Sequence, residues 1–307
     1  MPYPISTVDQ PTRPWVTDGG LETDLIFHRG IDLPEFAAFP LVEDPAGIAT
    51  LRSYYDDYVA IAAAAEAGII LETPTWRANA DWGTKLGYDT ADLARVNRAA
   101  VDLLRQLADE QRVDNVRISG VVGPRGDGYA PTGLPADSAA EYHAAQISTF
   151  ADAGVDFVHA MTVNQVAEAI GVVRAAQAAH VPVAMSFTVE TDGRLPDGTT
   201  LRGAIEQVDA VAPPDWYGVN CAHPTHLRPA LDGGAWQSRL SAFRPNASTL
   251  SHAELDEAED LDTGDRAFLA TTTRDIQRLV PSLSILGGCC GTDARHVAQI
   301  WGTAPAD

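Results

Sequence analysis

The stretch DFVHAMTVNQVAEAIGVVRAAQAAHVPVAMSF, residues 156–187, contains the unit that decides the fold. It opens with a short apolar run rich in β-forming residues, continues with a helical pattern over residues 164–180, and closes with a second apolar run. Neither apolar run alternates with polar residues, which is typical of parallel strands whose sheet is covered by helices. The stretch therefore predicts a strand, a helix and a second strand parallel to the first.

The same unit recurs along the chain. Helices are predicted at, among others, residues 47–67, 90–109, 138–153 and 164–180, with Thr90 and Asp137 as candidate N-caps. Strands are predicted at residues 15–17, 68–72, 116–122, 156–161, 181–187, 216–220, 240–244 and 283–286. Eight alternations predict an α/β fold of the (βα)8 TIM barrel type. A doubly wound open sheet is the alternative, but no G-x-G-x-x-G motif follows the first strand.

Length and composition are those of one globular domain. The 307 residues are 45% hydrophobic and 21% charged, and a barrel of this size commonly forms a single unit. No linker or charge block divides the chain, so residues 1–307 are expected to form one domain. No window approaches the roughly 18 apolar residues that span a bilayer. Residues 1–15 lack the basic and apolar regions of a signal peptide, so we expect an N-terminal loop and a cytoplasmic protein.

The charge balance excludes some partners. The formal net charge is −21, from 42 acidic and 21 basic residues, and no basic stripe interrupts the acidic surface. Such a chain is repelled by nucleic-acid phosphates and by anionic membranes, so neither is an expected partner. The acidic run at residues 252–265 predicts a solvated helix or loop, with a cation site as the alternative. The oligomeric state stays open.

In a barrel the chemistry lies at the C-terminal ends of the strands. The segments that follow the predicted strands are DGG at 18–20, ETPTW at 72–76, GPRGDGY at 123–129, MT at 161–162, NC at 220–221, PN at 245–246 and GGCCG at 287–291. The candidate binding residues on this rim are Asp18, Gly19, Glu72, Trp76, Met161, Asn220 and Asn246. The GPRGDGY segment is either a binding loop or a tight glycine turn, and its place on the rim favours the loop.

The only three cysteines of the chain, Cys221, Cys289 and Cys290, all lie on this rim. Two interpretations are open on spacing alone, namely small buried hydrophobic residues or a metal site. Their common placement favours the metal, and three thiolates select zinc and leave a fourth position open, as in catalytic zinc sites. His223 is a further ligand or, as loop histidines more often are, a supporting group.

An open zinc trithiolate activates a bound thiol or a bound water. Three thiolates donate heavily to the ion and weaken it as a Lewis acid, which favours chemistry of a sulfur nucleophile. The three cysteines would then be both the metal ligands and the centre of catalysis.

Motifs along nearly the whole chain resemble the homocysteine S-methyltransferase family of zinc barrels, which includes betaine-homocysteine methyltransferases and the homocysteine half of methionine synthase. They are DGGLETDL, GPRGDGY, SFTVETDGRLPDGT, GVNCAHP and GGCCGT. The resemblance implies that Cys221, Cys289 and Cys290 bind Zn²⁺. It also implies that Asp18 and Gly19 hold the amino-acid substrate and that Asn220 supports the ligand-bearing turn.

The reaction implied is attack of a zinc-bound thiolate, most simply that of homocysteine to give methionine, on a methyl group of a small donor. Without a further domain for cobalamin or folate, the expected donor is S-methylmethionine, S-adenosylmethionine or a betaine. Trp76 and Trp82 either face this methylated cation or pack a loop over the barrel mouth, and Arg77 between them opposes a cation if it points inward.

One position departs from the family. Members usually carry a glutamate after the fourth strand that binds the substrate's ammonium, and here Met161 stands at that place. Either Glu22, Glu72 or another acid replaces that glutamate, or the acceptor is a different thiol or selenol. A zinc-binding barrel without turnover is the third hypothesis.

Overall fold

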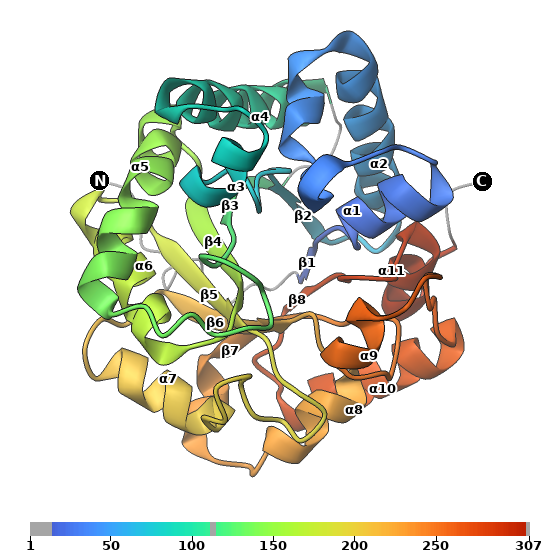
Figure 1. Cartoon of the computed structure of the whole chain (residues 1–307). Coiled ribbons are helices and arrows are strands. Elements are labelled where there is room, and N and C mark those ends of the chain that lie inside the picture. The colour runs from blue at the N-terminus through green and yellow to red at the C-terminus, as the bar shows by residue number, and fades with distance from the viewer. Residues whose placement is uncertain (1–13, 111–114, 305–307) are drawn as a thin grey trace.

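The computed structural model describes residues 14–110 and 115–304 and shows a closed barrel of eight parallel strands (Figure 1). The strands are β1 (Trp15–Val16), β2 (Gly68–Glu72), β3 (Val116–Val122), β4 (Phe157–Val163), β5 (Val183–Phe187), β6 (Trp216–Asn220), β7 (Leu240–Arg244) and β8 (Ile285–Leu286). Each strand pairs with the next, and β8 pairs with β1 to close the sheet. The predicted (βα)8 barrel is therefore confirmed, and the open sheet is excluded.

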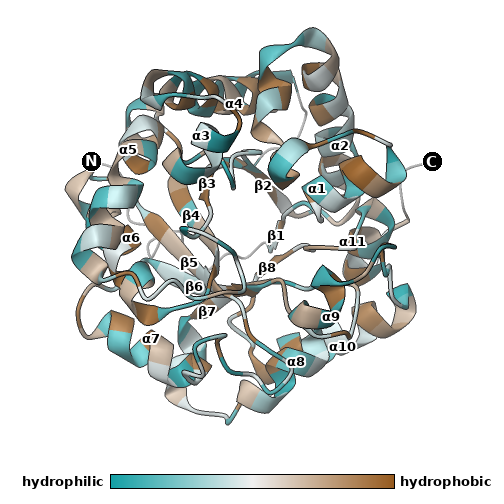
Figure 2. Ribbon diagram, viewed as in Figure 1, coloured by the Kyte–Doolittle hydropathy of each residue, from teal (hydrophilic) through white to brown (hydrophobic). Residues whose placement is uncertain are grey.

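The helices form a ring around the barrel when it is viewed along its axis (Figure 1). They are α1 (Leu21–Thr23), α2 (Pro45–Ala64), α3 (Ala80–Lys85), α4 (Thr90–Glu110), α5 (Ala136–Ala153), α6 (Val166–Ala178), α7 (Leu201–Asp209), α8 (Pro224–Leu227), α9 (His252–Asp256), α10 (Arg266–Leu279) and α11 (Ala294–Trp301). Their brown, hydrophobic segments alternate with teal ones in Figure 2, as expected for helices with one buried face.

Several predicted bounds shift by a few residues. β4 begins one residue later and runs on to Val163, and β8 keeps only the last two residues of its predicted range. The predicted N-cap at Asp137 is wrong, because α5 already begins at Ala136 after Pro135. At α4 the Asp89 carboxylate accepts hydrogen bonds from the Ala91 and Asp92 amides, so the cap lies one residue before Thr90.

The core has an inner and an outer part. Inside the barrel a small layer of large and small side chains packs together: Ile70, Phe157, Ala184, Trp216, Ala242 and Ile285. Two larger clusters fill the space between the strands and the helices. This apolar layer fills the barrel interior below the cavity, which opens at the C-terminal ends of the strands.

In the part of the chain that the structure describes, no helix is long and apolar enough to cross a membrane. The predicted N-terminal loop lies almost entirely outside the described residues. The acidic run forms α9 and the loop that follows it, as predicted, but it also reaches the barrel mouth.

Candidate functional site

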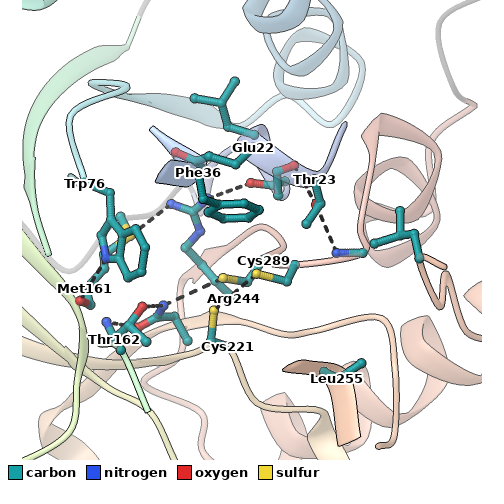
Figure 3. Close-up of a pocket in the computed structure, with 18 of the residues that line it drawn as sticks. Glu22, Thr23, Phe36, Trp76, Met161, Thr162, Cys221, Arg244, Leu255 and Cys289 are labelled. Atoms are coloured by element: carbon teal, nitrogen blue, oxygen red, sulfur yellow. Dashed lines mark hydrogen bonds between the residues drawn. The ribbon is translucent and has the colours of Figure 1, made fainter. Parts of the chain in front are cut away.

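A cavity of about 480 Å³ opens at the C-terminal ends of the strands (Figure 3). The predicted residues that line it are Asp18, Gly19, Glu22, Glu72, Trp76, Met161, Asn220, Cys221, Cys289 and Cys290. The mouth is lined by part of the acidic run, including Leu255, Asp256 and Asp262. Residues from most of the strand ends thus face one space.

Asn246 is the predicted residue that the structure does not bring to this wall. It is buried, and its backbone N–H donates to the Ala222 carbonyl oxygen at 3.3 Å. This hydrogen bond ties the loop after β7 to the loop after β6. Ser248 of the same loop lines the cavity instead. Asn246 therefore faces the protein interior and not the cavity.

The three cysteines form one cluster in the cavity wall. Their sulfur atoms lie within 4.8 Å of one another, and the Sγ atoms of Cys221 and Cys290 are 3.8 Å apart. All three thiols are free. Cys221 directly follows β6 with φ of 54°, a left-handed conformation that non-glycine residues seldom adopt. Backbone strain at this position turns the thiol toward the β8 loop.

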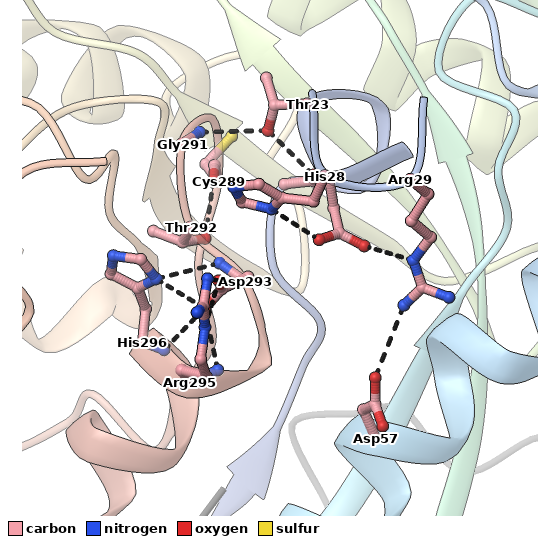
Figure 4. Close-up of polar contacts among 12 residues, drawn as sticks. Thr23, His28, Arg29, Asp57, Cys289, Gly291, Thr292, Asp293, Arg295 and His296 are labelled. Atoms are coloured by element: carbon pink, nitrogen blue, oxygen red, sulfur yellow. Dashed lines mark hydrogen bonds and ion pairs between the residues drawn. The ribbon is translucent and has the colours of Figure 1, made fainter. Parts of the chain in front are cut away.

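The β8 loop can pass this close because two of its residues have no side chain. A Cβ on Gly287 would lie 2.0 Å from the Thr17 hydroxyl oxygen, and one on Gly288 would lie 2.1 Å from that of Thr292. The loop is then tied to α1, because the Gly291 amide donates to the Thr23 hydroxyl oxygen at 3.1 Å (Figure 4). These contacts fix the direction of both adjacent thiols.

The donor set fits a zinc ion. Four ligands about 2.3 Å from a tetrahedral zinc are separated by about 3.8 Å, which is the distance between the Cys221 and Cys290 sulfur atoms. In the part of the chain that is described, no histidine or acid joins this group. His223 lies outside this group, and its Nδ1 accepts a hydrogen bond from the Thr225 amide at the start of α8. All three cysteines line the cavity.

Asn220 joins the thiols to β4. Its amide oxygen accepts from the Thr162 backbone N–H at 2.7 Å, and its NH₂ group donates to the Thr162 hydroxyl at 2.8 Å. The same NH₂ group lies 3.7 Å from the sulfur of Cys289. Thr162 has φ of 60° at an irregularity in the pairing of β4 and β5, so the strand is bent to meet Asn220.

Arg244 at the end of β7 is the central charge of the cavity floor. Its guanidinium pairs with Asp18 at 2.6 Å and with Glu72, and its Nε donates to the Gly288 carbonyl oxygen at 2.9 Å. It also donates to the Gly19 carbonyl oxygen at 3.0 Å, and it lies 3.5 Å from the Met161 sulfur. Burial opposes the charge of Arg244, but Asp18 raises its pKa above the ordinary value. One buried cation thus braces the loops that carry the acid and the thiols.

Glu72 is held on both sides. One oxygen pairs with Arg244, and the other lies 2.8 Å from Nδ1 of His159, whose Nε2 lies 2.7 Å from the Ser186 hydroxyl. Burial lowers the pKa of His159 to about 3, so the ring is neutral. Because an ionised carboxylate can only accept, Nδ1 carries the proton and Nε2 accepts from Ser186.

Glu22 lines the cavity above the sulfur atoms of the cysteines in Figure 3. It is half-buried, and burial raises its pKa to about 7, with Asp18 and Cys289 adding to the effect. Asp18 also has a raised pKa because of burial, in spite of Arg244 beside it. Both carboxyl groups therefore hold a proton more readily than they would in water, and a cation bound beside them would favour their ionised forms.

The two tryptophans behave differently. Trp76 lines the cavity, and its indole N–H donates to the Met161 carbonyl oxygen at 3.3 Å. Trp82 packs the loop, since Arg77 and Lys85 each lie 3.8 Å from its ring centroid. The proposed cation-facing role of Trp82 is therefore wrong, because side chains of the protein occupy its ring.

The 123–129 segment is a cavity loop. Asp127, Gly128 and Tyr129 line the cavity, and the Tyr129 ring stacks on His252 with centroids 3.9 Å apart. Nε2 of His252 lies 2.7 Å from the carbonyl oxygen of Cys221, within hydrogen-bond distance, and Nδ1 lies 2.9 Å from Glu190. This places an aromatic pair directly behind one of the thiols.

Comparison with known proteins agrees with this geometry. Residues 15–303 match the homocysteine S-methyltransferase family. The chain belongs to this family. It is 27% identical to rat betaine–homocysteine S-methyltransferase 1, over 75% of this chain and 59% of that protein. It is 29% identical to methionine synthase of Mycobacterium leprae, over 76% of this chain and 20% of that protein.

The fold is shared with a solved family structure. The metallated form of the Escherichia coli homocysteine methyltransferase MmuM superposes with a TM-score of 0.75 at 21% identity, covering 98% of this chain and 99% of that one. The predicted family and the predicted barrel are thus confirmed. The chain spans about three fifths of the rat relative and a fifth of the methionine synthase.

The sequence analysis missed Arg244 and His252, and it named Tyr129 only as the last residue of a candidate binding loop. Arg244 carried a signal, because it is the one charged residue of the strand LSAFR and stands at its C-terminal end. His252 carried none, since it lies at the start of the acidic run, and for Tyr129 the signal was only the position of its loop on the rim. Their roles depend on contacts between parts of the chain that are far apart in sequence.

Proposed function

We propose that this chain is a zinc-dependent S-methyltransferase that uses homocysteine as acceptor and forms methionine. The observation that carries the proposal is the cluster of Cys221, Cys289 and Cys290 on the cavity wall of a chain of this family. Zinc bound there would offer one free position to the acceptor's sulfur and lower the pKa of that thiol.

The protein's own residues would supply position. Asp18 and Gly19 line the wall beside Cys289 and would orient the acceptor, while Asn220 would hold the cysteine loop in place. The acceptor's thiolate sulfur would form a bond to the methyl carbon as the donor's bond to that carbon breaks. The donor would then leave as a neutral thioether or amine. Because the nucleophile is already ionised, positioning supplies most of the catalysis.

The donor would be a small sulfonium or quaternary ammonium compound, namely S-methylmethionine, S-adenosylmethionine or a betaine. Acidic side chains at the mouth, among them Asp127, Asp256 and Asp262, favour a positively charged ligand. The ring of Trp76 in the same wall supports a methylated cation. Arg77 lies 5.1 Å from that ring and would have to move if the cation bound there.

A second acceptor class is favoured by one contact. Met161 lies against the Arg244 guanidinium at 3.5 Å and offers no charge to an ammonium group. The same chemistry could therefore serve a different thiol or a selenol. A barrel that binds zinc without turnover is the third candidate.

The test measures zinc content and methyl transfer on one preparation. Homocysteine and other thiols are offered with each of the three donors, and Cys290→Ala serves as control. One zinc per chain, lost in the variant together with homocysteine methylation, supports the proposal. Zinc with transfer only to another acceptor supports the second candidate, and zinc without any transfer supports the third. Absence of zinc and of transfer contradicts all three.

A further inference from the structure

Three of the acidic side chains that line the cavity lie at the end of β2 or in the segment that follows β1, and two of these three are already paired. Asp18 accepts from Arg244 at 2.6 Å through one oxygen and from the Tyr54 hydroxyl at 3.1 Å through the other. Glu72 is held by Arg244 and His159. Both carboxylates are buried. Neither one presents an unpaired oxygen to a ligand.

Glu22 is the third acid, and its carboxylate is open. Within residues 14–110 and 115–304, no other side chain forms a hydrogen bond or an ion pair with it. It lines the cavity at the start of α1, four residues after Asp18, and is only half-buried. A partly desolvated carboxylate without a partner loses free energy that a bound cation would restore.

Arg77 is a cation of the protein that acts on Glu22, but it forms no ion pair or hydrogen bond with it within the described residues. Arg77 also lines the cavity, but its guanidinium lies over the Trp82 ring and donates to the Glu35 carbonyl oxygen. The opposite wall at Met161 and Thr162 carries no acid. The negative charges of Asp18 and Cys289 act on Glu22 and favour a cation in the space between them.

We infer that Glu22 binds the α-ammonium group of the amino-acid acceptor and thereby sets the acceptor preference. The inference rests on the proposed methyl transfer to a thiol. In homocysteine the sulfur and the nitrogen are four bonds apart, so one molecule could place its sulfur at the cysteine cluster and its ammonium on the wall at Glu22. An ammonium group forms charge-assisted hydrogen bonds with such an open carboxylate.

The test compares homocysteine with 4-mercaptobutyrate, which is the same thiol without the ammonium. The variants are Glu22→Gln, which keeps the shape and removes the charge, and Glu22→Asp, which keeps the charge. Glu35→Gln is the matched control, because Glu35 pairs with Lys85 and does not line the cavity. The readouts are the kcat/KM ratio of the two acceptors and, by calorimetry, their affinity for the zinc-loaded protein.

Loss of a charge-assisted contact should lower the preference for homocysteine roughly 10- to 100-fold in Glu22→Gln. Glu22→Asp should recover part of it, and Glu35→Gln should leave the ratio as in the wild type. An unchanged ratio in Glu22→Gln overturns the inference. So does a variant in which only the donor's KM rises, because Glu22 would then bind the donor's cation.

Calorimetry separates this inference from the proposed function. If no thiol is methylated but the wild type binds homocysteine more tightly than 4-mercaptobutyrate, and Glu22→Gln loses that difference, the inference stands and the proposed activity fails. If the wild type binds both thiols equally, the inference fails whatever the activity.

Discussion

Arg239 and Arg244 flank the same strand, β7, and show how differently the two ends of the barrel use an arginine. Arg239 precedes the strand, is 32% exposed, and forms two hydrogen bonds with Asp209 at 3.0 Å. It also donates to the carbonyl oxygens of Pro214 and Asp215. Arg244 ends the strand, is 6% exposed, and pairs with Asp18 and Glu72 beside the thiols.

The difference lies in what each arginine holds together. Arg239 joins the segment before β7 to the end of α7 at the base of the barrel, away from the cavity. Arg244 joins three loops that carry candidate site residues, at 18–20, at 72–76 and at 287–291. In this fold the base maintains stability and the rim carries chemistry. A buried charge on the rim, such as that of Arg244, therefore contributes both to stability and to the arrangement of the site.

The largest expected effect comes from Arg244→Met. The substitution leaves Asp18 and Glu72 as buried carboxylates without their cation, which should lower the free energy of unfolding by about 3–5 kcal/mol. It should also lower zinc content, because Gly288 next to Cys289 loses its hydrogen bond. Denaturant unfolding and metal analysis measure the two effects.

A double variant isolates the charge. Arg244→Met with Glu72→Gln removes one of the two stranded carboxylates, so it should regain a measurable part of the lost stability. The contrast between the two ends of β7 breaks down if Arg244→Met lowers the free energy of unfolding by less than about 1 kcal/mol. A loss of that size is typical of an exposed ion pair.

The next effect concerns the support behind Cys221. In His252→Phe the ring can still stack on Tyr129, but the contact with the Cys221 carbonyl oxygen at 2.7 Å is lost. Groups that orient a metal ligand typically change metal affinity by about 10- to 100-fold, so the zinc dissociation constant should rise by about that factor. Competition with a chelator measures it.

His226→Phe is the matched control. His226 also contacts a backbone carbonyl, that of Thr249 at 2.9 Å, but it does not touch a cysteine. Equal loss of zinc affinity in both variants would mean that His252 acts through general packing and not through the Cys221 turn.

The same comparison shows what the sequence could reveal. The barrel was predictable, because strand and helix patterns repeat eight times and depend on neighbours in the chain. The cysteine cluster was predictable too, because strand ends meet on one rim. Arg244 and Glu72 were not predictable as a pair, since nothing in a sequence states which charges meet across 172 residues inside a closed barrel.

Backbone conformation accounts for the remaining differences between the predicted and the observed positions of the site residues. The bend at Thr162 and the left-handed turn at Cys221 direct side chains in ways that a strand pattern does not encode. Asn246 likewise lies off the cavity wall, where its backbone N–H bonds to the Ala222 carbonyl oxygen. By contrast, Glu22 was one of two acids named for the ammonium, and only the pairing of Glu72 with Arg244 and His159 distinguishes them.

The smallest expected effect is that of Arg239→Met, the same substitution at the other end of β7. The ion pair of Arg239 with Asp209 is about one-third exposed, so solvent screens it. The substitution should therefore lower the free energy of unfolding by about 1 kcal/mol. Zinc content should not change, because none of its contacts reaches the cavity residues. The loss should shrink further in 1 M salt, whereas that of Arg244→Met should persist, because salt screens exposed charges and hardly affects buried ones. A loss at Arg239 as large as that at Arg244, or one equally insensitive to salt, would show that the position of an arginine along the barrel axis does not set its contribution.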